Sequence, residues 1–298
     1  MKNRLLFLVV LLAFGYESNG CDICGCTAGG NYLGILPQYQ KHFFGFRYNY
    51  SSYKSKHPDE GSFGNDYFHT TELWGRFAIN NRLHLYGILP FHFIKREEGD
   101  QKNRLNELGD ASLFVNYLIY DNSRSEKGTF KATLQLGGGI KLPTGKNDIV
   151  QDFHTLPENL QPGSGTIDYL LNAIYTVRYQ SVGINADVNY KIVQTNDKQY
   201  KRGDRLNTSF RFFMWNQLKT ITVLPHLGLD YEISATDTKY KKPVEFTGGN
   251  SLLTSIGVDL YYRNFSAGVR LQRTISQNLN QGNTSEKWRL GTQVLYLF

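Results

Sequence analysis

The carboxyl-terminal stretch constrains the fold of this chain more than any other feature. Counting back from the last residue, every second position is apolar or a threonine, namely Phe298, Tyr296, Val294, Thr292 and Leu290. This period of two is that of a β-strand with one apolar face. Because no strand follows, the free edge must pair with an earlier strand or stay open to aggregation. Pairing with the first strand closes a barrel, and in lipid such closure is compulsory because hydrocarbon offers an open edge no hydrogen-bond partners.

The same alternation recurs from residue 41 to residue 298 and gives about twelve strands, an even number as in exported single-chain barrels. The turns are short near Asn80, Asp121, Gln180, Asn216 and Arg263. The other connections are longer, including expected loops at 51–65, 95–106 and 143–165. Pro90 and Pro225 fall inside two strands, where each would remove a ladder hydrogen bond. The sequence predicts an all-β fold, an antiparallel transmembrane outer-membrane barrel with short turns and both termini on the periplasmic side.

Composition agrees with this fold class and excludes others. Aromatic residues make up 14% of the chain, with 20 Tyr and 19 Phe, residue types that favour strands and membrane-interface girdles. Mean hydropathy is -0.42, and after the amino-terminal region no run of eighteen apolar residues suggests a transmembrane helix. The net charge of +7 comes from scattered Lys and Arg side chains, so we expect no nucleic-acid partner.

The first forty residues divide into two predicted segments. Residues 1–20 have Lys2 and Arg4, an apolar run at 5–14 and small residues at 18–20, which is the pattern of a signal peptide. Residues 21–40 would then form a periplasmic segment that could plug the lumen of the barrel at 41–298.

All three cysteines lie in that segment, as Cys21, Cys24 and Cys26. Thiolates this close together select soft metals, so copper or zinc is one expectation, although the barrel itself requires no cofactor. A disulfide in the oxidising periplasm or lipidation of Cys21 are the alternatives.

Polar side chains opposite the apolar face are expected to line the lumen. They are Arg47, Glu72, Arg76, His84, His92, Asp110, Lys131, Lys141, Asp168, Arg178, Asp187, Lys191, Arg211, His226, Asp230, Glu232, Asp259 and Arg270. Mixed charges can pair across a bore, which narrows it and stabilises them away from bulk water. We therefore expect a wet, ionic lumen that is narrow or partly plugged, with little general porin conductance.

Two motifs carry a family resemblance. Leu108-Gly109-Asp110-Ala111 and the stretch from Gly137 to Gly145 resemble the outer-membrane family named for the meta-pathway of phenol degradation. The resemblance implies a channel or transporter for small, often hydrophobic or aromatic, compounds. The final Phe298 is similar to the ending of bacterial outer-membrane barrels, which implies recognition by the barrel-insertion machinery. From the residues themselves, we interpret Gly137, Gly139, Pro143 and Gly145 as a barrel bend and turn, with a substrate contact as the alternative.

The predicted function is transport of a small solute, either a hydrophobic or aromatic compound or a soft metal ion bound through the cysteines. Its partners would be outer-membrane lipid and the solute. A structural, adhesive or ligand-binding barrel without transport is the main alternative. We expect no enzyme: His69, His84, His92, His154 and His226 are available, but the sequence has no Gly-x-Ser-x-Gly motif for a hydrolase.

Overall fold

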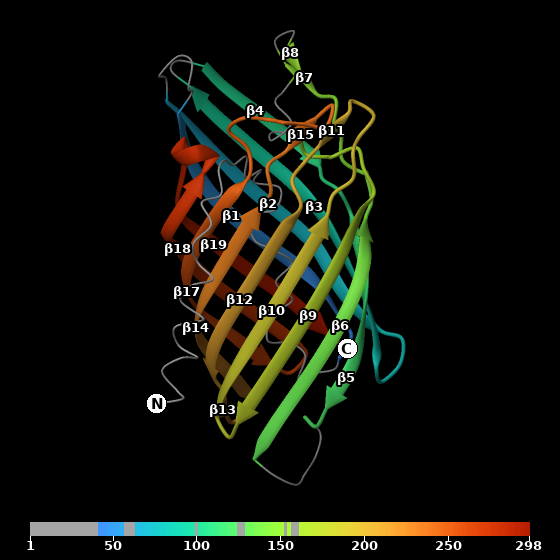
Figure 1. Ribbon diagram of the computed structural model, residues 1–298. Helices are drawn as coiled ribbons and strands as arrows, with labels where there is room; N and C mark the ends of the chain where they lie inside the picture. The colour runs from blue at the N-terminus through green and yellow to red at the C-terminus, as the bar shows by residue number, and fades with distance from the viewer. Residues whose placement is uncertain (1–40, 57–62, 99–100, 124–128, 152–153, 156–160) are drawn as a thin grey trace, which may run out of the picture.

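The computed structural model describes residues 41–56, 63–98, 101–123, 129–151, 154–155 and 161–298, which form a closed barrel of 12 antiparallel strands (Figure 1). One of the twelve is interrupted and consists of β4 and β5. The barrel strands are β1 (Phe43–Lys56), β2 (Phe63–Ala78), β3 (Leu83–Glu98), β4 (Gln101–Leu108), β5 (Ser112–Asp121), β6 (Phe130–Lys141), β9 (Asp168–Tyr179), β10 (Val182–Ile192), β12 (Arg205–Met214), β14 (Ile221–Ser234), β17 (Gly249–Tyr262), β18 (Phe265–Leu279) and β19 (Thr284–Leu297).

The barrel closes between the first and last strands, as the carboxyl-terminal pattern predicts. β1 pairs antiparallel with β19, from Phe43 opposite Leu297 to Ser55 opposite Thr284. Every other strand pairs with its neighbours in sequence, so the ring is complete. Around this ring each strand has a partner on both sides, except that β4 at the long-loop end pairs with β3 alone. Closure of the ring satisfies the backbone groups that hydrocarbon could not.

The two faces of the strands differ as the alternation predicts. Large apolar side chains on the outer face are exposed, with Phe46 at 59% and Val294 at 56%. Their neighbours in the sequence point inward, where Arg47 is 6% exposed. A large apolar exterior of this kind is unfavourable in water and suits a lipid environment. No helix among the described residues is long and apolar enough to cross a bilayer.

The connections give the barrel two different ends. At one end, the short-turn end, tight connections such as 180–181 and 263–264 join the strands, and residues 41 and 298 lie there. A small strand, β13 (Asn216–Leu218), extends the β12–β14 turn at this end. The opposite end, the long-loop end, carries β7 (Val150–Gln151), β8 (His154–Thr155), β11 (Tyr200–Lys201), β15 (Thr238–Lys239), β16 (Lys242–Pro243) and a 3-10 turn at Asn280–Gly282 (Figure 1).

Two predicted loops are largely strand. β1 continues to Lys56 and β2 begins at Phe63, so most of the expected loop at 51–65 belongs to a hairpin. The expected loop at 95–106 is likewise a hairpin of β3 and β4, in which Lys95 lies opposite Arg104. The polar composition of both stretches predicted loops, but strands that extend beyond the membrane have no need of apolar side chains.

Both strand prolines are accommodated within the ladder. Pro90 lies where β3 changes partner, since Ile88 pairs with β5 and Phe91 pairs with β4. Between β4 and β5 the chain leaves the ladder at 109–111, opposite Pro90, which has no backbone N–H to donate. The Gly109 N–H donates to the Pro90 carbonyl at 2.9 Å. Asp110, expected on a strand, therefore lies in this interruption of the β4–β5 strand.

The expectation of a wet lumen throughout is wrong. A buried apolar layer fills the short-turn end, formed by inward side chains that include Phe43, Phe213, Leu224, Tyr261, Leu295 and Leu297. A second apolar group of Tyr53, Phe68, Ile94 and Leu279 lies towards the long-loop end. Trp74 contacts the Phe43 ring edge to face, with 4.7 Å between ring centroids. Inward aromatic side chains close part of the bore that polar residues were expected to keep open.

Candidate functional site

The strands place the predicted pore-lining residues on the inward face. The buried members are Arg47, Arg76, His84, His92, Lys141, Asp168, Asp187, Arg211, His226, Asp230 and Asp259. The half-buried members are Glu72, Asp110, Lys131, Arg178, Lys191, Glu232 and Arg270. Lys131 and Arg178 face each other near the short-turn end, where the Arg178 guanidinium lies 4.5 Å from the Trp215 ring centroid.

Ion pairs and aromatic contacts hold the charges of the central lumen. Arg211 donates to Asp230 at 2.5 Å, and the Gln272 amide reaches the other oxygen of that carboxylate at 2.9 Å. Arg47 donates to Glu72 at 3.2 Å and stacks over Trp74, 4.0 Å from the ring centroid. Because each of these four charges has a partner, the cost of removing it from bulk water is offset.

A second ionic group was only partly visible in the sequence. Arg289 donates to Glu232 at 2.6 and 2.8 Å and to Glu286 at 2.5 and 2.8 Å. Glu232 was predicted to line the lumen, whereas Arg289 and Glu286 were missed. Arg289 fits the alternation of the last strand, on the side opposite its apolar row, whereas Glu286 does not, because a register irregularity lies between Ser51 and Tyr53 of β1, opposite β19. It lets two residues three positions apart both face inward, which strict alternation does not allow.

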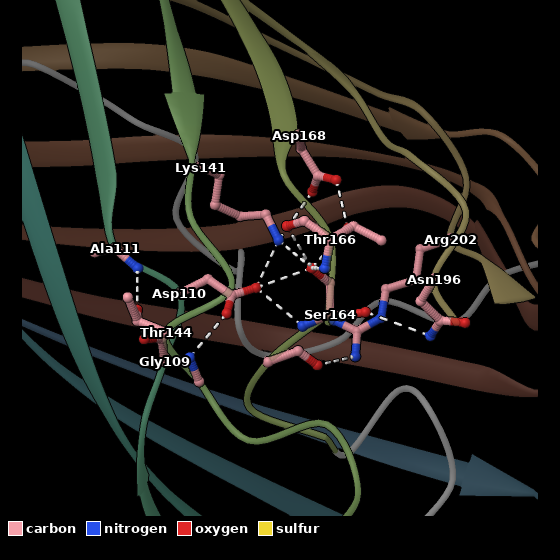
Figure 2. Close-up of polar contacts among 12 residues, drawn as sticks. Gly109, Asp110, Ala111, Lys141, Thr144, Ser164, Thr166, Asp168, Asn196 and Arg202 are labelled. Carbon is pink, nitrogen blue, oxygen red and sulfur yellow. Dashed lines mark hydrogen bonds and ion pairs between the residues drawn. The ribbon is translucent and has the colours of Figure 1, made fainter. Parts of the chain in front are cut away.

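A third group, the mouth cluster, lies at the long-loop end (Figure 2). It comprises Asp110, Lys141, Ser164, Thr166 and Asp168. The Lys141 ammonium lies 2.5 Å from Asp110 and 2.9 Å from Asp168, and it also donates to the Ser164 hydroxyl. The Thr166 hydroxyl donates to Asp168 at 2.7 Å. One lysine thus joins the strand interruption, β6 and the start of β9.

Asp110 also holds the long loop at 142–167 against the barrel. Its carboxylate accepts from the Gly145 N–H at 3.0 Å and from the Ser164 N–H and hydroxyl at 2.9 and 3.0 Å. Gln161 is completely buried and Ser164 is 5% exposed, so this part of the loop lies inside the mouth. The loop therefore narrows the long-loop end of the lumen.

The two motifs that carry the family resemblance meet in this cluster. The Thr144 hydroxyl donates to the Gly109 carbonyl at 2.9 Å and accepts from the Ala111 N–H at 2.8 Å. Gly145 packs against the Leu108 carbonyl, where an added Cβ would come within 2.9 Å. The motifs are far apart in the sequence, and their shared position shows that they build one structure at the mouth.

Gly137 and Gly139 lie within β6, which runs without interruption from Phe130 to Lys141. A Cβ on Gly139 would lie 2.2 Å from the Leu113 carbonyl oxygen, and one on Gly137 would lie 2.0 Å from the Asn116 side chain. These contacts show close approach of neighbouring groups at both glycines, while the barrel bend stays a prediction. Pro143 follows the last strand residue and begins the loop.

The predicted metal ligands lie outside the described residues, as do the signal peptide and the plug at 21–40. Within the part of the chain that the structure describes, no three His, Cys, Asp or Glu side chains are grouped to hold a metal ion. Of the histidines, His92 faces the lumen and its Nδ1 lies 3.0 Å from the Thr70 hydroxyl. His69 instead contacts Tyr48 at 2.7 Å on the outer face.

Comparison with known proteins identifies the fold. No protein-family model matches the chain, and no curated protein matches it in sequence. The barrel is similar to the COG4313 outer membrane channel from Pseudomonas putida F1, with a TM-score of 0.62 and 12% identity over 87% of this chain and 95% of that chain. The beta domain of the Bordetella autotransporter Brka aligns over 87% of this chain and 100% of its own, with a TM-score of 0.48 and 11% identity. The first likeness shows the fold of an outer-membrane barrel, while membership of the meta-pathway family stays a prediction.

Proposed function

We propose that this protein is an outer-membrane channel or transporter that passes a small solute through a narrow, charged lumen. The observation that carries the proposal is the closed barrel with an exposed apolar exterior and a lumen crossed by ion pairs. The likeness to a solved outer membrane channel supports it. Short turns face the periplasm in such barrels, so the short-turn end and both termini are assigned to that side.

Selectivity follows from the filling of the lumen. The mouth cluster and the Arg289 group occupy the long-loop end, and the apolar layer occupies the short-turn end. Twelve strands give a bore between filled eight-stranded barrels and open sixteen-stranded porins. Inward side chains of this size therefore hinder general diffusion, so the solute of the proposed channel must be small.

The solute class that the resemblance suggests is a small hydrophobic or aromatic compound. The buried aromatic side chains of the lumen, among them Trp74, Tyr86 and Phe114, support this class because such rings contact apolar solutes favourably. A soft metal ion captured by Cys21, Cys24 and Cys26 is the second candidate. Equilibrium dialysis of the reduced full chain against copper(I) or zinc tests it, and absence of saturable binding would remove it.

Reconstitution of the full chain tests the channel itself. We expect small single-channel currents in planar bilayers and entry of small solutes into proteoliposomes, with exclusion of larger sugars. The matched control is Lys241→Gln, which alters an exposed charge in an outer loop and should leave both readouts unchanged. Large stable currents would contradict the narrow lumen, and proteoliposomes that admit no solute would contradict transport.

A further inference from the structure

The outer surface of the barrel changes from apolar to basic along the hairpin formed by β3 and β4. Phe91 and Phe93 of β3 point outward, where they are 37% and 42% exposed and their ring centroids lie 5.0 Å apart. Two residues further along β3, alternation places Lys95 on the same face. Arg104 of β4 lies directly opposite Lys95. Basic side chains therefore follow immediately after aromatic ones on the outside of this hairpin.

Neighbouring contacts confirm that these basic side chains face away from the lumen. Leu105 of β4 packs inward against the apolar group at the long-loop end, so the adjacent Arg104 lies on the outer face and is exposed. The Lys95 ammonium lies 5.5 Å from the ring centroid of Tyr67 on β2. Asp66, next to Tyr67 in the sequence, is buried inside the barrel. The inward carboxylates are thus separated from the outer cations by the barrel wall.

The outward charges of the hairpin do not balance among its described side chains. Glu97 is the one carboxylate on this face, and it lies 2.6 Å from Lys95. Lys102 lies opposite the same Glu97, whereas Arg104 has the cation Lys95 opposite it. Like charges placed in this way on neighbouring strands destabilise a sheet. An anion beside Arg104 would remove that repulsion.

The edge of β4 offers a second kind of donor. β4 pairs with β3 alone, so within the described residues its other edge has no strand beside it. Backbone N–H groups on an open edge are donors that a ligand can use. Charged side chains on such an edge discourage pairing with another protein strand, which favours a small anionic group over a peptide as the ligand.

The depth of the cations in the membrane identifies the anion. A strand rises about 3.3 Å per residue, so Lys95 lies about 7 Å along the strand beyond Phe93. The headgroup layer on each side of the hydrocarbon core is about 5–8 Å thick, and aromatic side chains gather where that layer begins. Lys95 and Arg104 are therefore at headgroup level, where lipid phosphates are the abundant anions. The Arg guanidinium fits phosphate through two parallel hydrogen bonds.

We propose that the outer face of the β3–β4 hairpin binds the phosphate group of a membrane lipid. Lys95, Lys102 and Arg104 hold the phosphate, while Phe91 and Phe93 contact the acyl chains. The site lies on the outside of the barrel, so it does not depend on transport through the lumen. In the orientation assigned above, the bound lipid belongs to the external leaflet.

The test uses the full chain in detergent, with dimyristoyl phosphatidic acid as the probe and native mass spectrometry as the measurement. We expect saturable retention of this lipid. Diacylglycerol with the same acyl chains should bind about tenfold more weakly or less, because each basic side chain near a membrane surface strengthens binding of an anionic lipid about fivefold. Equal retention of diacylglycerol would overturn the role of the cations. Displacement of the lipid by an equal concentration of inorganic phosphate would overturn the acyl contact.

Arg104→Gln separates a lipid site from a structural role. The substitution removes the charge opposite Lys95, so thermal stability in detergent should be at least unchanged while retention of phosphatidic acid falls about fivefold. Lys242→Gln alters an exposed cation of a different outer loop and is the matched control, which should retain the lipid as the unchanged protein does. Undiminished retention by Arg104→Gln, or an equal loss in Lys242→Gln, would overturn the assignment to the hairpin. A loss of stability in Arg104→Gln would show a structural role for the arginine and would also overturn it.

Discussion

The attachment of the loop that narrows the mouth depends on the Asp110 carboxylate, and Asp110→Asn tests how strongly that carboxylate holds the loop. The substitution preserves size but removes the charge that pairs with Lys141 and that accepts hydrogen bonds from Gly145 and Ser164. Hydrogen bonds to charged groups contribute about 1.5–3 kcal/mol each, and the amide can keep some of these contacts. Lys141 also retains Asp168 at 2.9 Å, so no buried charge is left alone.

We therefore estimate that loop attachment weakens by about 2–4 kcal/mol, which raises the ratio of detached to attached loop roughly thirty- to a thousandfold. The barrel strands do not depend on this contact, so the variant should still fold and insert. Detachment would remove Gln161 and Ser164 from the mouth and widen it. The expected result is a larger single-channel current and faster proteolysis within 142–167.

Glu107→Gln is the matched control. Glu107 lies on the same interrupted strand and pairs with Lys146 of the same loop at 2.6 Å, but the lysine side chain is 62% exposed. Exposed ion pairs contribute about 0–1 kcal/mol, so current and proteolysis should change little. If Asp110→Asn behaves like Glu107→Gln in both assays, the carboxylate does not hold the loop and the reasoning is refuted.

Three further substitutions test the barrel itself. Gly139→Ala should prevent correct assembly, because the added Cβ would lie 2.2 Å from the Leu113 carbonyl oxygen. Gly138→Ala should fold, because the nearest carbonyl oxygen to its Cβ lies at 3.5 Å. Heat-modifiable gel mobility distinguishes a folded barrel from an unfolded one. Arg289→Met leaves two inward carboxylates without their shared cation and should destabilise the barrel by about 3–5 kcal/mol in urea titrations, and no change would refute the pairing. Leu271→Arg puts a charge on the lipid-facing surface and should cost about 2–4 kcal/mol in bilayers, with little effect in detergent; equal effects in both would contradict the assigned face.

The alternation of side chains made the barrel predictable. Strand faces follow from a period of two, so Phe46 outside and Arg47 inside could be assigned before any register was known. Closure followed from the need to pair the last strand. Arg211 and Asp230 could be placed on the inner face in the same way, but their 2.5 Å contact depends on the register of β12 against β14.

Features that depend on departures from alternation were not predictable. The strand interruption at 109–111 adds residues that no period of two accommodates, and it decides where Asp110 points. Phe43 and Leu297 face inward although their neighbours are also apolar, so the pattern there does not distinguish the two faces. The return of Ser164 into the mouth depends on contacts between segments far apart in the sequence.

The two ends of the lumen therefore favour different properties of a solute. The long-loop end holds paired charges such as Lys141 and Asp168, 2.9 Å apart, and these polar groups can compensate a solute for part of the water that it loses there. The apolar layer at the short-turn end offers no such compensation, and a fully hydrated ion would be hindered by it. A molecule with a polar group and an apolar body can contact both regions in turn, because its polar group stays near the long-loop end while its skeleton enters the apolar layer. For the proposed transport function, the order of these regions along the bore thus favours amphipathic solutes over inorganic ions and strongly polar solutes.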